Sequence, residues 1–164
     1  MNILVTGGAG FVGKPLVESL LSRGDSVTVL TRSIEKAQAI FSEKTPQFLT
    51  ALSILKDLNE FDTVINLAGE PIFDKRWTVQ QKEKLRHSRV DLTQQLVQLI
   101  NQSKHPPVLI SGSATGIYGN CGEELISEDT NPSTQFTAQL CIDWENAAKQ
   151  ANTRVCLART GLVL

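Results

Sequence analysis

The residues of this chain best suited to chemistry are the glycines of one short segment. Gly7-Gly8-Ala9-Gly10-Phe11-Val12-Gly13 directly follows the apolar, β-branched run Asn2-Ile3-Leu4-Val5-Thr6. Gly7 permits a tight turn, Gly10 lets the backbone approach a ligand, and Gly13 allows a helix to pack closely on the strand. A helix that begins here presents unpaired N–H groups and positive potential to an anion, so the segment predicts a phosphate-binding loop.

The neighbouring segments narrow this prediction to a dinucleotide. An amphipathic helical pattern with Pro15 in its first turn follows the glycines, and 26–30 is a second apolar strand. This strand–loop–helix–strand order is typical of a dinucleotide site. We expect the cofactor to contact Thr6, Gly7, Gly10, Phe11, Val12 and Gly13. The alternative is a tight turn between strand and helix that binds nothing.

The residues after the second strand indicate which dinucleotide is bound. An NAD site usually carries Asp or Glu there to bind the ribose 2′-hydroxyl, and Thr31-Arg32-Ser33 contains neither. Arg32 offers a planar cation that suits a 2′-phosphate, and Thr31 and Ser33 offer hydroxyl groups. The sequence therefore favours NADP over NAD. The alternative is a solvated arginine near the start of a helix.

Strand and helix patterns alternate along the chain and predict a parallel sheet covered on both faces. The predicted strands are 2–6, 26–30, 47–50, 62–67, 108–111 and 154–158, whereas 52–58 is ambiguous. A short helix is expected over 34–42, and a long one opens at Trp77-Thr78 and ends at His105. A long irregular connection over 112–133 precedes a last helix with Phe136, Leu140, Trp144, Ala147 and Ala148 on its apolar face. We predict an α/β fold, a Rossmann-type doubly wound sheet of order 3-2-1-4-5-6, as one domain over residues 1–164.

Ligands of such sheets bind beyond the carboxyl ends of the strands. Leu67, Ala68 and Gly69 place small residues where a cofactor would cross the fourth strand. Ser111-Gly112-Ser113 presents hydroxyl groups near the expected nicotinamide position. The alternatives are a helix-entry turn for the first segment and polar residues that close a strand for the second.

Composition excludes several classes of function. The hydrophobic fraction of 41%, the charged fraction of 20% and the net charge of −1 give no electrostatic case for nucleic acid or an anionic membrane. The three cysteines (Cys121, Cys141 and Cys156) lack metal-ligand spacing and indicate reduced thiols, no metal and a cytoplasmic location. The first strand begins at residue 2, so we expect no signal peptide.

The motifs together resemble the extended and atypical short-chain dehydrogenase/reductase superfamily. Within it they are most similar to a group of predicted nucleoside-diphosphate-sugar epimerases, related to NAD-dependent epimerases and dehydratases. Beyond the glycine loop, the resemblance is carried by 66–72, 76–78, 88–90, 111–119, 143–145 and 159–164. It implies that Gly7, Gly10 and Gly13 bind the phosphates, Arg32 the 2′-phosphate, and Ala68 and Gly69 the cofactor. It also implies that Ser113 is the catalytic Ser/Thr.

The chain departs from that superfamily at its acid/base pair. The Tyr-x-x-x-Lys positions fall near Thr137 and Cys141, which supply neither a phenolate nor a fixed cation. Tyr118 is the chain's one tyrosine and is a second catalytic candidate, the alternative being a packed loop tyrosine. Arg76, Lys82 and especially Arg89 could clamp an anionic substrate, or they are solvated helix charges.

The chain also ends where members of the superfamily continue into a substrate-binding region. We therefore expect a truncated N-terminal part, with an apolar end at 161–164 that favours either association, for example as a homodimer, or disorder. The leading hypothesis is an NADP-dependent epimerase or oxidoreductase that acts by hydride transfer on a small molecule such as a sugar nucleotide. The runner-up is a non-catalytic NADP-binding module that senses redox state or supports assembly. The missing pair leaves open whether the chain is an enzyme.

Overall fold

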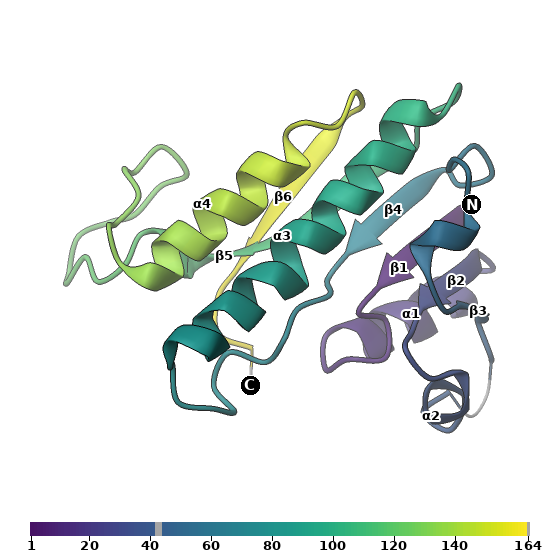
Figure 1. The fold of residues 1–164 in the computed structure, drawn as a ribbon, viewed down its shortest axis with the longest axis horizontal. Helices are drawn as coiled ribbons and strands as arrows, with labels where there is room; N and C mark the ends of the chain where they lie inside the picture. The colour runs from purple at the N-terminus through teal and green to yellow at the C-terminus, as the bar shows by residue number, and fades with distance from the viewer. Residues whose placement is uncertain (42–43, 164) are drawn as a thin grey trace.

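The apolar, β-branched segments of the sequence pair into one parallel sheet (Figure 1). The computed structural model describes residues 1–41 and 44–163. Its strand order is β3-β2-β1-β4-β5-β6, which confirms the predicted order. The strands are β1 (Asn2–Thr6), β2 (Ser26–Leu30), β3 (Gln47–Leu49), β4 (Thr63–Asn66), β5 (Val108–Ala114) and β6 (Val155–Thr160).

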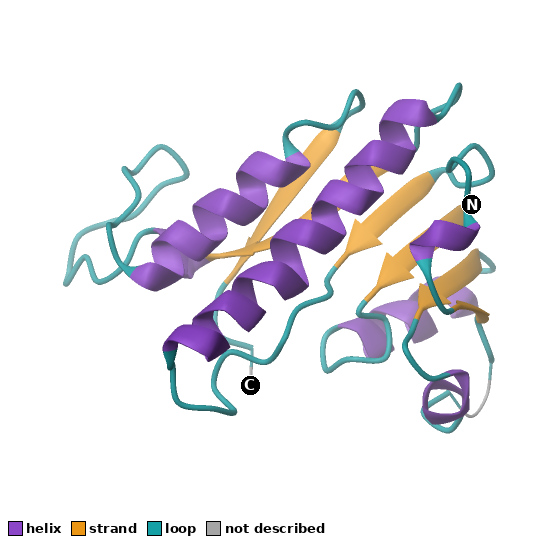
Figure 2. Cartoon of the chain, viewed as in Figure 1, coloured by secondary structure: helices purple, strands orange, loops and turns teal. Residues whose placement is uncertain are grey.

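Helices lie on both faces of this sheet (Figure 2). The long helices α3 (Val79–Gln102) and α4 (Phe136–Ala148) run side by side across one face. The helix α1 (Gly13–Ser22) lies behind the sheet and contacts β1 and β2. The shorter elements are α2 (Ile34–Gln38), η1 (Leu52–Ile54) and η2 (Thr115–Ile117). In the part of the chain that the structure describes, no helix has the length and apolarity needed to span a membrane.

Each face of the sheet has its own hydrophobic core because alternate strand residues point to opposite sides. Leu4 of β1 and Val64 of β4 pack with Leu96 and Ile100 of α3. Their neighbours face the other way, where Ile3, Val5 and Ile65 pack with Val17 and Leu20 of α1. The central strands are therefore buried on both sides, as their unbroken apolar runs predict.

The structure corrects several predicted boundaries and resolves one ambiguous stretch. The irregular connection expected from Gly112 begins later, because residues 112–114 pair with 158–160 of β6 and extend β5. The predicted helix 34–42 ends at Gln38, and its expected last residue, Ser42, lies outside the described residues. The ambiguous stretch 52–58 holds the single 3₁₀ turn η1. Pairing with β6 decides where β5 ends, and a pattern within one segment does not encode that pairing.

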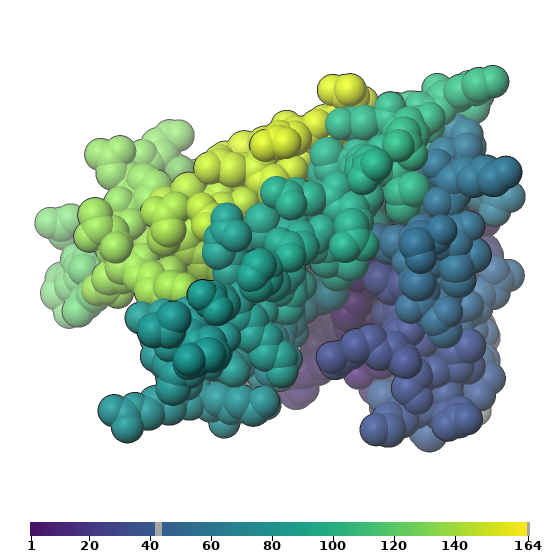
Figure 3. Space-filling view, in the orientation of Figure 1, coloured from purple at the N-terminus to yellow at the C-terminus, as the bar shows by residue number. Residues whose placement is uncertain are grey.

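The carboxyl ends of the strands meet at one edge of the sheet. The glycine loop after β1, the segment after β4 and the first turns of α3 all reach this edge (Figure 1). In the space-filling view the surface is hollowed between the start of α3 and the purple N-terminal part of the chain (Figure 3). This is the edge where the sequence places the candidate site.

Candidate functional site

The glycine loop has the backbone geometry that phosphate binding requires. Gly7 adopts φ +69°, and its carbonyl accepts a hydrogen bond from the N–H of Gly10 at 2.9 Å. A Cβ on Gly13 would lie 2.1 Å from that carbonyl oxygen, so α1 packs directly on the loop. Val12 provides no side-chain cap for α1, which leaves the first N–H groups of the helix without a side-chain partner. Phe11 and Val12 are exposed at the mouth of this loop.

Gly7 also brings the loop against the segment that follows β4. A Cβ at Gly7 would lie 2.8 Å from the backbone of Leu67 and Ala68. The N–H of Ala68 donates to the hydroxyl of Thr6 at 3.2 Å, which fastens the two strand ends together. The residues predicted to contact the cofactor from β1 and from β4 therefore form one continuous backbone surface.

Arg32 extends from the end of β2 as an exposed side chain. Among the residues that the structure describes, no hydrogen bond or ion pair engages its guanidinium. The hydroxyl of Thr31 donates to the carbonyl of Ser33 at 3.1 Å, and Ser33 caps α2 by accepting from the N–H of Lys36 at 3.4 Å. The Thr31 hydroxyl is therefore bonded within its own segment, whereas no group of the described residues uses the donors of Arg32.

A buried polar network lies beneath this surface. Asn66 accepts from the Thr6 hydroxyl at 2.7 Å and donates to the hydroxyls of Thr93 at 2.8 Å and Ser111 at 3.3 Å. The indole N–H of Trp144 donates to the same Thr93 hydroxyl at 3.0 Å. These bonds connect β1, β4, β5, α3 and α4 at the carboxyl edge. Ser111, a predicted cofactor contact, is fully buried in this network.

Arg89 lies between the segment after β4 and α4. Its guanidinium carbon is 5.4 Å from the centroid of the Trp144 ring, and a Cβ on Gly69 would lie 2.7 Å from that carbon. Its Nη1 donates to the carbonyl of Leu85 at 3.2 Å, and no carboxylate of the described residues pairs with it. Desolvation lowers the pKa of Arg89. Arg76, in contrast, is exposed, and Lys82 lies over the ring of Phe136.

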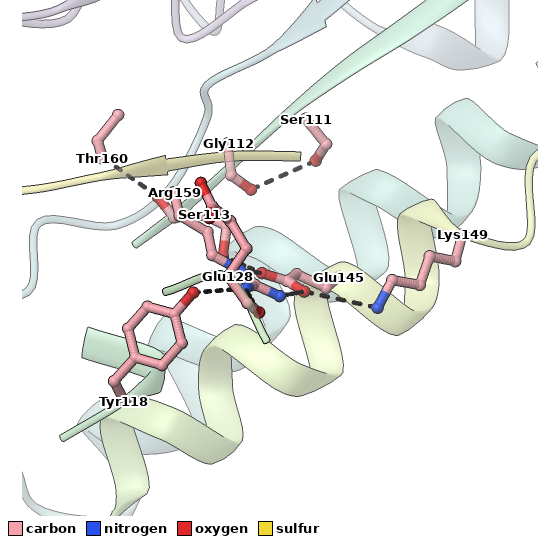
Figure 4. Close-up of polar contacts among 9 residues, drawn as sticks. All are labelled: Ser111, Gly112, Ser113, Tyr118, Glu128, Glu145, Lys149, Arg159 and Thr160. Carbon is pink, nitrogen blue, oxygen red and sulfur yellow. Dashed lines mark hydrogen bonds and ion pairs between the residues drawn. The ribbon is translucent and has the colours of Figure 1, made fainter. Parts of the chain in front are cut away.

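The two catalytic candidates, Ser113 and Tyr118, belong to one network (Figure 4). The hydroxyl of Ser113 donates to Oε1 of Glu145 at 2.7 Å. Arg159 donates from Nε and Nη2 to the two oxygens of Glu145 at 2.8 and 2.9 Å. Its Nη1 donates to the Tyr118 hydroxyl at 2.6 Å. An ion pair therefore separates the serine from the tyrosine.

This ion pair has the electrostatics of a tight buried contact. Glu145 is 2% exposed, and burial by itself raises its pKa, but the hydrogen bonds from Arg159 and Ser113 outweigh burial and hold the pKa below its ordinary value. The same contact raises the pKa of Arg159. Lys149 approaches Glu145 Oε2 at 3.5 Å from the solvent side. Both charges of the pair are thus fixed at neutral pH.

Glu145 and Arg159 were not among the site residues predicted from the sequence. A signal was present, because Glu145 follows Cys141 by four residues on the face of α4 that carries Ala138, Cys141 and Ala148. A carboxylate on a buried face requires a cation. The register of β5 and β6 supplies that cation, since Arg159 is the pairing partner of Ser113, and this register is not visible in the sequence.

The positions of the missing acid/base pair lie on the first turns of α4. Cys141 is 7% exposed and packs with Ile117 and Tyr118. Desolvation raises the pKa of the Cys141 thiol, in spite of hydrogen bonds with Ala114 and Ser113 that lower it. The thiol is therefore held neutral where a lysine would place a cation.

The parallel sheet, the glycine turn and the uncapped start of α1 place the chain in the class of NAD(P)-binding Rossmann folds. Comparison with known families narrows this class. The family model described as "NAD dependent epimerase/dehydratase family" matches residues 3–164. The chain belongs to this family.

Similar proteins agree with this assignment. The chain is 38% identical to the epimerase family protein SDR39U1 homolog, chloroplastic, of Arabidopsis thaliana, over all of this chain and 49% of that protein. The structure of human epimerase family protein SDR39U1 (isoform 2) with NADPH superposes with a TM-score of 0.86 at 30% identity, over 100% of this chain and 55% of the human one. The structure of UDP-glucuronic acid 4-epimerase from Bacillus cereus, in complex with UDP-glucuronic acid and NAD, superposes with a TM-score of 0.79 at 25% identity. The match covers 97% of this chain and 56% of the epimerase chain. The chain thus spans about half the length of these relatives.

Proposed function

We propose that this chain binds NADP and forms the cofactor-binding part of an epimerase or oxidoreductase that transfers hydride. The observation that carries the proposal is the glycine loop, whose close backbone approach and uncapped helix start fit a pyrophosphate. The human relative whose structure contains NADPH supports the choice of cofactor. Arg32, exposed and without an ion pair in the described residues, is the group that would bind the 2′-phosphate.

The bound dinucleotide would supply the hydride, and the residues of the chain would move the proton. We assign the transfer of this proton to the hydroxyl of Tyr118, a residue that lines a pocket next to Arg159. Ser113 is 3% exposed and its only proton is donated to Glu145. We therefore give Ser113 a positioning role through that carboxylate, in place of the direct substrate contact that the resemblance implies.

An anionic part of the substrate has a partner in Arg89. This guanidinium is partly desolvated, makes no ion pair in the described part of the chain, and keeps Nε and Nη2 beside Gly69. A desolvated cation with unused donors favours a phosphate or carboxylate. A sugar nucleotide, with its diphosphate at Arg89 and its sugar toward Tyr118, fits this arrangement.

The test uses the full-length protein and NADPH deuterated at the hydride position, with a panel of keto-sugar nucleotides, whose ring carbonyl can accept the hydride. We expect the wild type to transfer deuterium to one class of substrate. The rate of transfer by Tyr118→Phe should be at least about 100-fold lower, which is the usual contribution of a general acid or base. Its affinity for NADPH should equal that of the wild type. Ser113→Ala should lose less, and Thr134→Ala, an exposed loop hydroxyl, should lose nothing.

The outcomes separate the two hypotheses. Tight NADPH binding without transfer to any member of the panel would favour the non-catalytic NADP-binding module, which the absence of the usual acid/base pair supports. Failure to bind NADPH would contradict both. Equal loss of rate in Tyr118→Phe and Thr134→Ala would remove Tyr118 from the mechanism.

A further inference from the structure

A small pocket lies beside Tyr118, between η2, the end of β6 and the connection that precedes α4. It encloses about 220 Å³ and is lined by Thr115, Tyr118, Ile126, Ser127, Glu128 and Arg159. Pockets for whole drug-sized ligands measure roughly 300–1,000 Å³, so this one holds a single ring or a smaller group. The chemistry of its lining decides which group that is.

The cation in the pocket wall has almost no capacity left for a ligand. Arg159 has five N–H donors, and it uses four of them on Glu145, the Tyr118 hydroxyl and the carbonyl of Glu128. The carboxylate of Glu145 neutralises the charge of the Arg159 guanidinium through two hydrogen bonds of 2.8 and 2.9 Å. A phosphate or carboxylate that entered the pocket would meet a neutralised guanidinium, and Glu128, one of the lining residues, is itself acidic.

The same bonds determine which way the Tyr118 proton points. Arginine has no acceptor, so in the contact of 2.6 Å the Tyr118 oxygen accepts and Arg159 donates. The phenolic proton is left over, and within the described residues no hydrogen bond takes it. Tyr118 lines the pocket, so its O–H is available as a donor to a ligand there.

We propose that this pocket binds an uncharged, carbonyl-bearing group and rejects anions, with Tyr118 as hydrogen-bond donor and Glu145 as the positioning residue that sets this selectivity through Arg159. Glu145 neutralises Arg159, and Arg159 orients the Tyr118 hydroxyl. The inference rests on the proposed function only in taking the pocket as the place where the reacting group of the substrate binds. Arg89 remains the partner for an anion, because no carboxylate of the described residues occupies its N–H donors.

A matched pair of probes tests the inference in the full-length protein. Acetophenone is a neutral ketone, and benzoate is an anion of nearly the same size and shape. We expect the wild type to bind acetophenone at least about tenfold more tightly than benzoate, measured by ligand-observed NMR. Tyr118→Phe should weaken acetophenone binding about fivefold, as expected for one lost hydrogen bond, and leave benzoate unchanged.

Glu145→Gln gives the sharper result, because it frees the charge and at least one donor of Arg159. Benzoate should then bind more tightly than acetophenone, a reversal that a merely structural role would not produce. Glu124→Gln, which removes an exposed carboxylate of the same connection, is the control and should keep the wild-type order. If Glu145→Gln does not fold, Tyr118→Phe alone decides.

Three results would overturn the inference: no binding of acetophenone to the wild type, benzoate binding as tight as that of acetophenone, or acetophenone affinity unchanged in Tyr118→Phe. A parallel NADPH titration keeps this inference apart from the proposed function. NADPH binding without ketone preference overturns the pocket assignment alone. Ketone preference without NADPH binding overturns the proposed function alone.

Discussion

Arg159 binds both carboxylate oxygens of Glu145, with Nε 2.8 Å from Oε1 and Nη2 2.9 Å from Oε2. The contact joins the buried face of α4 to β6, the edge strand of the sheet. Two parallel N–H···O bonds of this kind are the strongest form of a side-chain ion pair and fix the geometry of both partners. The orientations of Ser113 and Tyr118 both depend on this pair.

Removal of the carboxylate charge should destabilise the fold. Glu145→Gln leaves Arg159 as a partly buried cation without its counter-charge, and breaking one partner of a buried pair costs about 3–5 kcal/mol. The loss of unfolding free energy is measurable by urea denaturation, with Glu124→Gln as a surface control that should stay within about 0.5 kcal/mol of the wild type. Similar values for the two variants would mean that the pair contributes little.

The same pair should make stability fall in acid. The pKa of Glu145 is lower in the folded protein than its ordinary value of 4.5, so its contribution is fully present above that pH and is lost as the pH falls through the folded pKa. Unfolding free energies measured from pH 6 to pH 3 should decline for the wild type more steeply than for Glu145→Gln. Parallel pH profiles for the two proteins would assign the acid sensitivity to other carboxylates.

The sequence was sufficient for the sheet order and for the glycine loop, and insufficient for the ion pair. The first two depend on local patterns, namely alternating strand and helix segments and glycines next to a strand. The ion pair depends on a register in which Ser113 and Arg159 become neighbours across two strands. Glu145 was detectable as a charge on an apolar face, but its partner, 14 residues further on, was not. Registers between strands follow from packing of the whole sheet, which a single segment does not contain.

Arg32 should decide between NADP and NAD. Arg32→Ala is expected to weaken NADP binding by about 1–3 kcal/mol, because a charge-assisted contact with the 2′-phosphate is lost. NAD carries no phosphate at that position, so its affinity should change little. Titration of both cofactors by fluorescence or calorimetry provides the comparison. Equal losses for the two would show that Arg32 acts on something other than the 2′-phosphate.

Gly10 and Gly13 should respond differently to the same added methyl group. A Cβ at Gly13 would lie 2.1 Å from the Gly7 carbonyl oxygen, so Gly13→Ala forces α1 away from the loop and should cost about 1–3 kcal/mol of stability. A Cβ at Gly10 would meet only that oxygen, at 3.1 Å, and would otherwise project into the phosphate site. Gly10→Ala should therefore keep most of its stability and lose cofactor affinity. Cofactor binding by Gly10→Ala at the wild-type level would place the phosphates elsewhere.

Thr93 tests whether the buried polar network supports the carboxyl edge. Its hydroxyl accepts from Asn66 at 2.8 Å and from the Trp144 indole at 3.0 Å, and it donates to the carbonyl of Arg89 at 2.7 Å. Thr93→Val keeps the shape of the side chain but leaves two buried donors without an acceptor. Each unsatisfied donor costs about 1–3 kcal/mol, so a total loss of about 2–6 kcal/mol is expected in urea denaturation.

The control for this variant is Thr134→Val, an exposed loop position where no buried donor loses a partner. Because Trp144 also packs against Arg89, release of its indole should change the environment of that guanidinium. We therefore expect Thr93→Val to weaken binding of an anionic substrate as well as stability, whereas NADP affinity should change less, since Arg32 lies at the end of a different strand. A stable Thr93→Val protein would mean that Asn66 and Trp144 find other acceptors, and that the network is not what holds α3 and α4 to the sheet edge.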